Sequence, residues 1–380
     1  MHWTAVCTRR LQRHGLADGS AHPTCADAVA AMCGAHAQVL SAAELSVGLR
    51  VDGATRADVR RALWQERSLV KTFGPRGTIH LLPTRDLPLW TGALSALPAR
   101  RSPFKEDVRL SPEQTDVVVD AIADALVDAE LTADELTTAI VARAGAWAGD
   151  LVMPAFQGFW PRWRQATHTA AHRGALCFGL NRGRQVTYTS PRRWLPGFAP
   201  ATGAAALDEL VRRYLHAYGP ATGEHLARWL NVTPAWAAQR FAALGDALEE
   251  VELEGAPAWV LAGDAALPGD PPPAVRLLPY FDAYTVAAQP RAALFPGRAA
   301  QRALAGGQAG NFPVLLVDGV VAGVWHQRRS GRRITLTVEP LSRLNAQRRS
   351  ALQAETERLG AILEGRPELT IGTVSAGPHA

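Results

Sequence analysis

The sequence predicts a mixed α+β fold in which three tandem winged-helix units precede a C-terminal β-barrel-like domain. One order of elements, two helices around a tight turn and then a β hairpin, recurs three times along the chain. After the proline tract at residues 271–273 the pattern changes to alternating strands, so this tract is the expected linker. With 380 residues, 47% hydrophobic and 20% charged, we expect globular domains at residues 1–105, 106–200, 201–270 and 271–380.

The third unit has the clearest order of elements. Residues 224–230 (EHLARWL) predict a short amphipathic helix that ends at Asn231. Thr233 and Pro234 then supply a helix cap and a proline at the first helical position, so a second helix follows over residues 235–244. The next residues, VELEGAPAWVL, predict two strands around a glycine-containing turn, as a wing requires.

The first unit repeats this order with two predicted helix caps. Ser41 and Glu44 form the S-x-x-E pattern of a capping box, so a helix is expected to begin near Ser41. Residues 55–58 (TRAD) cap a second helix in the same way. Residues 68–82 (SLVKTFGPRGTIHLL) then hold two β-rich runs around Gly-Pro-Arg-Gly, which predicts a hairpin wing.

The middle unit begins with another capping box at residues 132–135 (TADE). A long stretch rich in aromatic and basic residues, 156–174, follows the predicted helix. The unit closes with ALCFGLNRGRQVTYT, in which residues 181–184 (NRGR) predict a basic hairpin tip.

Strand signals dominate the C-terminal region. Residues 314–317 and 320–325 flank Asp318-Gly319, a strong two-residue hairpin signal, and residues 333–338 (RITLTV) predict a third strand. The glycine-rich stretch at 306–312 predicts a mobile loop without regular structure.

The charge balance favours an anionic partner. The formal net charge is +5 and the pI is about 9.3, and all basic residues except Lys71 and Lys105 are arginines, whose planar fork suits phosphates and base edges. A helix-turn-helix unit can also serve as a dimerisation or scaffold module, but three in tandem with basic wings favour nucleic-acid binding. The candidate DNA-binding residues at the hairpins are Lys71, Arg76, Arg182, Arg184, Arg328, Arg329 and Arg332.

The sequence also argues against a membrane protein, a secreted protein and a zinc protein. No run of 18 apolar residues is present and the first ten residues lack a signal peptide's apolar stretch, so we expect no membrane association and a cytoplasmic, nucleoid-associated location. The four cysteines have no C-x-x-C spacing, which predicts free buried thiols with neither zinc nor a structural disulfide. We expect no metal, no cofactor and no obligate protein partner.

The most informative short segment is His36-Ala37-Gln38. Residues 24–27 (TCAD) predict a helix start and Gly34 suits its C-terminal cap, which leaves His-Ala-Gln in an extended connector before the next helix. Side chains alternate along an extended segment, so His36 and Gln38 are expected on one side with Ala37 opposite. The alternative is that both residues only bind backbone groups of the connector.

The chain resembles the winged-helix DNA glycosylase superfamily of AlkZ-like and YcaQ-like proteins. The resemblance covers nearly the whole chain and rests on AHAQVLSAAEL, on the wing LVKTFGPRGTIHLLP and on RLLPYFDAYTVA at residues 276–287. In that superfamily a catalytic Gln-apolar-Gln or Gln-apolar-Asp motif precedes the helix. The position of that motif here holds His36-Ala37-Gln38, which departs from the pattern at its first residue.

The resemblance implies three winged-helix units around a positively charged channel for double-stranded DNA. It also implies monofunctional excision of cationic N7-alkylated purines, including bulky genotoxin adducts, in base excision repair or antibiotic self-resistance. His36 and Gln38 become the candidate catalytic residues. Asp282 and Tyr284 are candidates for either a structural role or an approach to the lesion. The alternative function is a non-catalytic winged-helix transcriptional regulator, and a protein-interaction scaffold is a further one.

Overall fold

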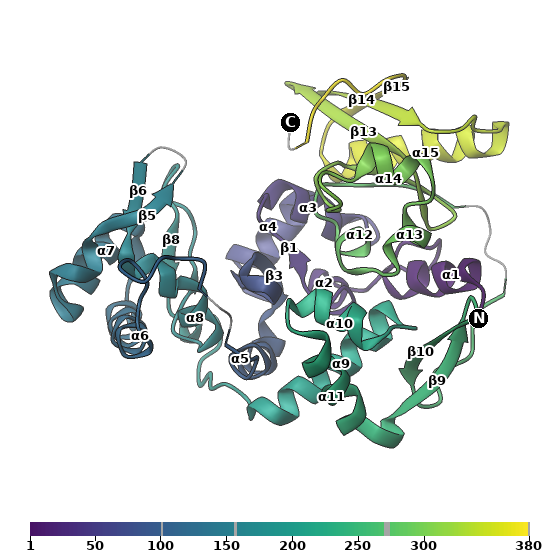
Figure 1. Cartoon of the computed structure of the whole chain (residues 1–380). Coiled ribbons are helices and arrows are strands. Elements are labelled where there is room, and N and C mark those ends of the chain that lie inside the picture. The colour runs from purple at the N-terminus through teal and green to yellow at the C-terminus, as the bar shows by residue number, and fades with distance from the viewer. Residues whose placement is uncertain (100–101, 156–157, 270–273, 379–380) are drawn as a thin grey trace. The chain divides into compact units, whose positions relative to one another are not determined.

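The computed structural model describes residues 1–99, 102–155, 158–269 and 274–378 (Figure 1). The chain divides into two compact units, Met1–Glu66 with Val211–Ala380 and Arg67–Leu210, which we call unit 1 and unit 2. The mixed α+β class predicted from the sequence is confirmed. The predicted linker at 271–273 lies outside the described residues, and the four predicted domain boundaries stay a prediction.

The N-terminal part of unit 1 is mostly helical. Its elements are α1 (Trp3–Arg13), α2 (Cys25–Ala31), β1 (Ala35–His36), α3 (Leu40–Gly48) and α4 (Arg56–Trp64). The predicted caps at Thr24 and Thr55 are both present, since each side chain accepts a hydrogen bond from the backbone three residues later. The C-terminal cap of α2 is Met32 and not the predicted Gly34; Gly34, with φ +94°, lies two residues further on.

The predicted capping box of Ser41 and Glu44 is wrong. Helix α3 begins at Leu40 with Val39 at the cap position and no side-chain cap. The Glu44 carboxylate instead accepts two hydrogen bonds from Arg60 of α4, from Nε at 2.6 Å and from Nη2 at 2.9 Å. A bidentate ion pair is stronger than a bond to a neutral backbone N–H, so the contact between helices prevails over local capping.

The predicted third helix-turn-helix and its hairpin are present in unit 1. After α9 (Gly203–Tyr218), which begins in unit 2, the elements are α10 (Gly223–Leu230), α11 (Pro234–Leu244), β9 (Leu248–Leu253) and β10 (Ala256–Leu261). Asn231 ends α10 in the left-handed conformation, with φ 57°, and the Thr233 side chain caps α11. Strands β9 and β10 pair antiparallel, from Ala256 with Leu253 to Leu261 with Leu248.

The C-terminal part of unit 1 is a five-stranded sheet in the order β11-β12-β13-β14-β15, curled into a half-barrel. Its elements are β11 (Val275–Leu278), α12 (Ala283–Ala287), α13 (Arg291–Leu294), α14 (Arg298–Ala303), β12 (Val314–Val317), β13 (Val320–Ser330), β14 (Arg333–Pro340), α15 (Ala346–Ile362) and β15 (Arg366–Ile371). The β12–β13 turn is Asp318-Gly319, both with positive φ, as predicted. Only β14 and β15 pair in parallel, and α15 is the crossover between them.

Unit 2 contains a hydrophobic core that includes Ile122 and Trp163. Its elements are β2 (Leu69–Phe73), β3 (Ile79–Pro83), α5 (Leu87–Ser95), α6 (Pro112–Leu126), β4 (Glu130–Thr132), α7 (Ala133–Ala144), β5 (Leu151–Ala155), β6 (Gly158–Pro161), α8 (Thr167–His172), β7 (Cys177–Phe178) and β8 (Thr187–Thr189). The predicted capping box of Thr132 and Glu135 is present at α7. Strands β2 and β3 pair antiparallel as the predicted first hairpin, and the number of winged-helix units stays a prediction.

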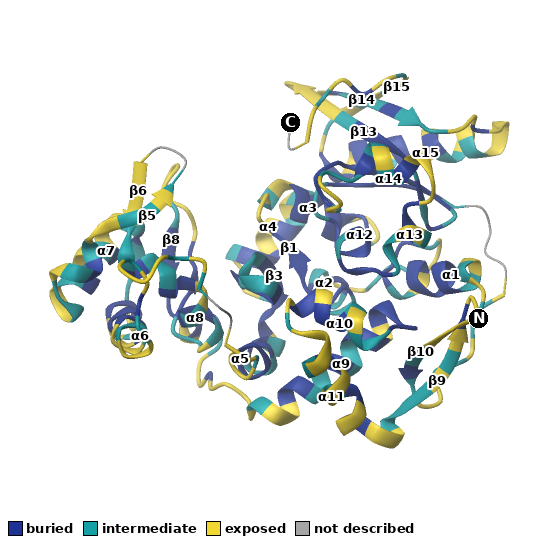
Figure 2. Cartoon of the chain, in the orientation of Figure 1, coloured by how far each residue is buried: buried dark blue, intermediate teal, exposed yellow. Residues whose placement is uncertain are grey.

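The aromatic and basic stretch at 156–174 contains one strand of a hairpin that the sequence pattern did not reveal. Strands β5 and β6 pair antiparallel, and residues 156–157 between them lie outside the described residues. Figure 2 shows the two strands mostly in the exposed and intermediate colours. Leu151, Phe159 and Trp160 are exposed, and the Arg164 guanidinium lies 4.3 Å from the centre of a Trp160 ring.

Two further sequence expectations concern membranes and thiols. No helix among the described residues is long and apolar enough to cross a membrane. None of the four cysteines forms a disulfide; Cys7, Cys33 and Cys177 are buried, whereas Cys25 is half-buried.

Candidate active site

His36 and Gln38 lie in unit 1 on the short segment that joins α2 to α3. Strand β1 ends at His36, and the next helix begins at Leu40. His36 and Ala37 are buried, with exposed fractions of 9% and 1%, whereas Gln38 is exposed. Strand β1 covers only Ala35 and His36, and the chain bends at Gln38 and Val39, so the predicted extended connector is confirmed only for its first part. The two candidate catalytic residues nevertheless differ in their access to solvent.

The imidazole of His36 stacks on the phenyl ring of Phe281. The two ring centres are 4.7 Å apart and the ring planes differ by 19°. Phe281 belongs to the turn between β11 and α12, inside the RLLPYFDAYTVA pattern. Two sequence segments separated by some 240 residues therefore meet at the candidate catalytic histidine.

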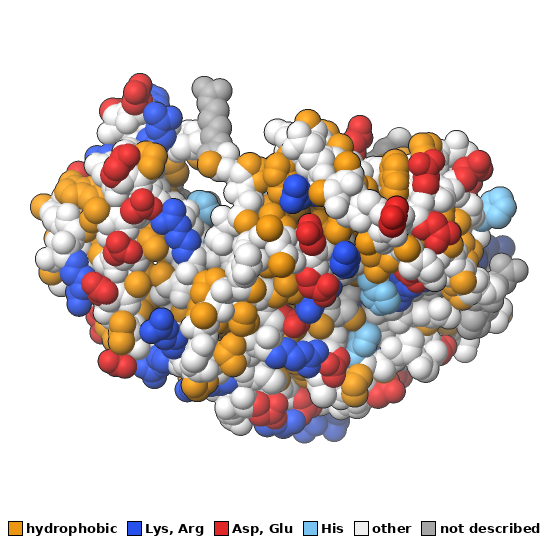
Figure 3. All heavy atoms as spheres, turned by 90° about the horizontal axis from the view of Figure 1, so that it is seen from below, with side chains coloured by type: hydrophobic (Ala, Val, Ile, Leu, Met, Phe, Trp, Pro, Cys, Tyr) orange, Lys and Arg blue, Asp and Glu red, His pale blue; other side chains and the backbone are white. Residues whose placement is uncertain are grey.

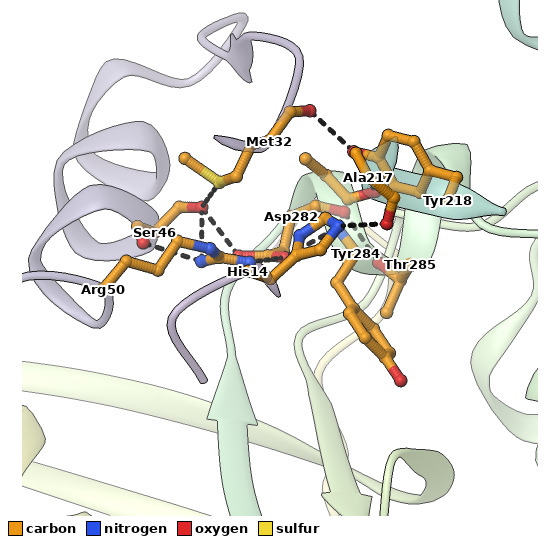
Figure 4. Close-up of polar contacts among 10 residues, drawn as sticks. His14, Met32, Ser46, Arg50, Ala217, Tyr218, Asp282, Tyr284 and Thr285 are labelled. Atoms are coloured by element: carbon orange, nitrogen blue, oxygen red, sulfur yellow. Dashed lines mark hydrogen bonds and ion pairs between the residues drawn. The ribbon is translucent and has the colours of Figure 1, made fainter. Parts of the chain in front are cut away.

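The residue after Phe281 fixes this turn to α3. Asp282 Oδ2 accepts hydrogen bonds from Ser46 Oγ at 2.6 Å and from Arg50 Nη1 at 2.9 Å, and Oδ1 accepts one from Arg50 Nη2 at 2.8 Å (Figure 4). Oδ1 also accepts the backbone N–H of Tyr284 and so caps α12. The side chains of Arg50 and Asp282 are fully buried. Because Asp282 is buried and satisfied in this way, its contacts favour the structural role.

A second group of polar side chains packs beside this ion pair. His14 Nε2 contacts the carbonyl oxygen of Ala217 at 3.2 Å, and Tyr218 Oη donates to the carbonyl oxygen of Met32 at 2.7 Å (Figure 4). Burial, with a smaller effect from the positive charge of Arg50, holds the pKa of His14 well below its usual range. Burial raises the pKa of Tyr218 and of Tyr284, whose hydroxyl donates to the carbonyl oxygen of Gly319. These neutral groups tie α1, α9 and α12 together.

The candidate DNA-binding residues of unit 2 differ in exposure. Lys71 is buried to 9% exposure, and its Nζ lies 4.7 Å from the centre of the Phe178 ring. Burial lowers the pKa of Lys71, so its position weighs against a contact with phosphate. Arg76 is half-buried in the β2–β3 turn. Arg182 and Arg184 are exposed at the predicted hairpin tip, where Arg182 pairs with Glu135 at 3.0 Å.

The remaining basic candidates lie at one end of the β13–β14 hairpin in unit 1. Arg328, Arg329 and Arg332 are exposed. Arg329 donates through Nη1 to the carbonyl oxygen of Leu363 at 2.8 Å. On the face shown in Figure 3, Lys and Arg side chains are interspersed with Asp and Glu.

Sequence reasoning missed three residues of the candidate site: Ser46, Arg50 and Phe281. Arg50 and Asp282 carry opposite charge in otherwise apolar segments, which is the signal that could have indicated a buried pair. Nothing in the sequence pattern indicated the stacking of Phe281 on His36. Among the described residues no group of three or more His, Cys, Asp or Glu could hold a metal ion.

Comparison with known proteins connects this geometry to a family. The family model "DNA glycosylase AlkZ-like" matches residues 29–362, which include His36, Gln38 and the Phe281–Asp282 turn. An interstrand DNA cross-link repair glycosylase from Streptomyces sahachiroi is 32% identical over 331 residues, covering 85% of this chain and 87% of that protein. The solved structure of the Streptomyces sahachiroi DNA glycosylase AlkZ is similar with a TM-score of 0.81 and 29% identity, over 98% of this chain and all of that one. The chain therefore belongs to the AlkZ-like family of DNA glycosylases.

Proposed function

We propose that the enzyme hydrolyses the N-glycosidic bond of cationic N7-alkylated purines in double-stranded DNA, with His36 and Gln38 as its catalytic residues. The observation that carries the proposal is the segment before α3, where a buried, ring-stacked histidine is followed two residues later by an exposed glutamine. The similar protein from Streptomyces sahachiroi is an interstrand DNA cross-link repair glycosylase, which supports bulky adducts as substrates. We further propose repair of genotoxin damage as the biological role.

The proposed chemistry uses side chains without a carboxylate. An N7-alkylated guanine carries a positive charge, so the base leaves readily and needs no strong general acid. The sugar carbon C1′ becomes electron-poor as the bond breaks, and polar groups held beside it stabilise the transition state. In this role His36 orients the attacking water or accepts its proton, and the Gln38 carbonyl oxygen faces the water or the sugar. Ordinary purines, which lack the positive charge, are expected to be poor substrates.

Binding to DNA is proposed to use exposed arginines of the predicted winged-helix units and of the C-terminal sheet. Arg182, Arg184, Arg328 and Arg332 are exposed on hairpins, as contacts with phosphate require. Such contacts position a duplex without reading its sequence, which suits an enzyme that must find lesions in any sequence context. We propose that the reaction is monofunctional, so that it ends with an abasic site and an intact strand.

The test is excision from defined duplexes. One duplex carries N7-methylguanine, one carries a bulky N7 adduct and one carries unmodified guanine, each at a single labelled position. Strand cleavage by mild alkali after incubation reports abasic sites, and we expect it for both modified duplexes but not for the unmodified one. Cleavage without alkali would show that the reaction is not monofunctional. Binding to the duplexes without any abasic product would contradict the proposal and favour a DNA-binding regulator.

A further inference from the structure

We propose that Phe281 is a positioning residue for His36, which holds the imidazole plane in the orientation that excision requires. The inference rests on the proposed catalytic role of His36. Its basis is the nearly parallel stacking of the two rings, 4.7 Å apart between centres. The Phe281 ring covers one face of the imidazole, and Nδ1 of His36 is itself buried.

The backbone of Phe281 is held in an unfavourable conformation. Its φ is 55°, in the left-handed region that bulky residues rarely adopt. Such conformations persist only where the surroundings enforce them, and they concentrate at functional sites. Contacts on both sides of Phe281 enforce this conformation here: the Phe281 N–H donates to the carbonyl oxygen of Gly310 at 3.1 Å, and the next residue is the buried Asp282 paired with Arg50.

A third contact places the ring itself. Gly310 has φ +98°, and a Cβ atom at this position would lie 2.9 Å from Cδ1 of Phe281. The absence of a side chain at Gly310 therefore leaves room for the phenyl ring in its stacked position. The loop at residues 306–312, for which the sequence predicted mobility and no regular structure, thus takes part in placing the aromatic ring against His36.

Stacking has a direct consequence for catalysis. The second side-chain torsion of histidine has broad preferences, so packing must decide the direction of its nitrogen atoms. A water molecule that attacks the sugar has to be held within hydrogen-bond distance of one of these nitrogens. A flat aromatic face stacked on the imidazole restricts its rotation more than an aliphatic side chain of similar size does. Phe281 therefore contributes to the reaction through His36 without itself touching the reacting atoms.

The competing explanation is that the half-buried ring of Phe281 contacts the lesion directly. The two explanations differ in a double-mutant cycle, because a residue that acts through His36 loses its effect once His36 is replaced. We therefore compare Phe281→Leu and the conservative Phe281→Tyr in the wild type and in the His36→Gln background. Single-turnover excision of N7-methylguanine is measured at saturating enzyme, together with affinity for undamaged duplex and thermal unfolding.

We expect Phe281→Leu to slow excision roughly ten-fold in the wild type and less than about two-fold in the His36→Gln background. Phe281→Tyr keeps the aromatic face and should keep nearly full activity. In proton NMR spectra, the His36 ring signals, assigned by their loss in His36→Gln, should move downfield in Phe281→Leu as the ring-current shielding disappears. They should stay in place in Phe281→Tyr.

Different outcomes overturn different claims. An equal loss in both backgrounds, or His36 signals that do not move in Phe281→Leu, would overturn the positioning role while the proposed function stands. Full activity of His36→Gln and His36→Ala, with the signal shift still observed, would instead remove His36 from catalysis and leave Phe281 as a purely structural partner. A failure of Phe281→Leu to fold is recognised by its unfolding curve, in which case the Phe281→Tyr variant and the wild-type ring-current shift decide whether the rings stack.

Discussion

Arg50 and Asp282 form a bidentate ion pair, with N to O distances of 2.9 and 2.8 Å and no exposure of either side chain. Arg50 lies just after the end of α3 and Asp282 caps α12, so the pair joins the helix that follows His36 to the turn that carries Phe281. The ion pair therefore fixes, relative to each other, the two segments that carry the stacked rings of His36 and Phe281. The ion pair thus holds the segments of the candidate active site in place.

We predict that Asp282→Asn destabilises unit 1 strongly. Removing one partner of a buried ion pair leaves an uncompensated charge, which costs about 3–5 kcal/mol. Urea-induced unfolding, followed by circular dichroism, measures the loss. The control is Glu368→Gln, which breaks an ion pair with Arg333 whose side chains are 50% and 65% exposed, and it should cost less than about 1 kcal/mol. Equal losses for the two variants would show that burial does not set the strength of the Arg50–Asp282 contact.

Local signals predicted much of the fold. Thr24, Thr55, Thr132 and Thr233 all cap the helices that their positions suggested, and Asp318-Gly319 forms the expected hairpin turn. These features depend on a few neighbouring residues, which is why sequence patterns identify them. The capping box of Ser41 and Glu44 failed because Glu44 pairs with Arg60 in a different helix, and such a partner is not visible in a local pattern.

The candidate site was predictable only in part. The candidate catalytic segment could be located because AHAQVLSAAEL resembles the motif of the winged-helix DNA glycosylases. The sequence alone does not show which arginines are exposed and able to bind phosphate and which are buried structural cations. Arg10, Arg50 and Arg276 are buried, and Arg276 donates to the carbonyl oxygen of Leu16 at 2.6 Å. The stacking of Phe281 on His36 depends on packing between two segments that are distant in the sequence, and residue spacing does not reveal such a contact.

DNA affinity should depend steeply on salt, and the basic residues should differ in their contributions. Each phosphate contact releases counterions, so loss of one exposed contact lowers the slope of log K against log salt by about 0.9. We expect this change for Arg332→Gln, because Arg332 is exposed. Lys71→Met should leave the slope unchanged, since Lys71 is buried against Phe178. Binding titrations of undamaged duplex at several salt concentrations measure both; an equal drop for Lys71→Met would place Lys71 at the DNA.

Acid should destabilise the folded state partly through His225. Burial, with smaller effects from Arg10 and Arg228, lowers the pKa of His225 to about 4 in the folded protein. The unfolded chain binds a proton at this residue near pH 6.5, so between pH 6.5 and 4 the unfolded state holds more protons. The free energy of unfolding should therefore fall as pH decreases through this window, by up to about 3 kcal/mol from His225 alone.

The matched variant for this effect is His225→Gln, because glutamine can still accept the hydrogen bond from the Thr222 backbone N–H that His225 Nδ1 accepts. Unfolding free energies from pH 7 to pH 4 should decline less steeply in His225→Gln than in the wild type. The control is His2→Gln, since the side chain of His2 is 91% exposed. Parallel curves for the wild type and His225→Gln would show that His225 is not neutral in the folded state over this range.

His36→Ala and Gln38→Ala should each abolish most excision while leaving DNA binding intact. Loss of a group that activates or positions water costs about 100-fold or more in the chemical step. Single-turnover rates and affinity for undamaged duplex separate catalysis from binding. The matched control is Ser41→Ala, because Ser41 is exposed in the first turn of α3 and its side chain does not cap the helix. Full activity in both alanine variants would show that His36 and Gln38 have only a structural role.

The pH dependence of excision should distinguish this enzyme from a variant with glutamine at position 36. Histidine ordinarily titrates near pH 6.5 whereas glutamine does not titrate. If the neutral imidazole orients water or accepts its proton, protonation removes the lone pair and adds a positive charge beside a cationic sugar, so the excision rate should fall on the acid side. An imidazolium that donates a hydrogen bond would instead lose activity as pH rises, but it would place like charge next to C1′.

The measurement is single-turnover excision of a chemically stable N7 adduct from about pH 5 to pH 9, with the wild type and His36→Gln compared at saturating enzyme. We expect an acid-side loss in the wild type that is absent or much smaller in His36→Gln. Because acid also destabilises the fold, each rate is accompanied by a measurement of the folded fraction at the same pH. Parallel profiles for the two enzymes would eliminate His36 as the titrating catalytic group, and a loss confined to the alkaline side would assign the active form to the imidazolium.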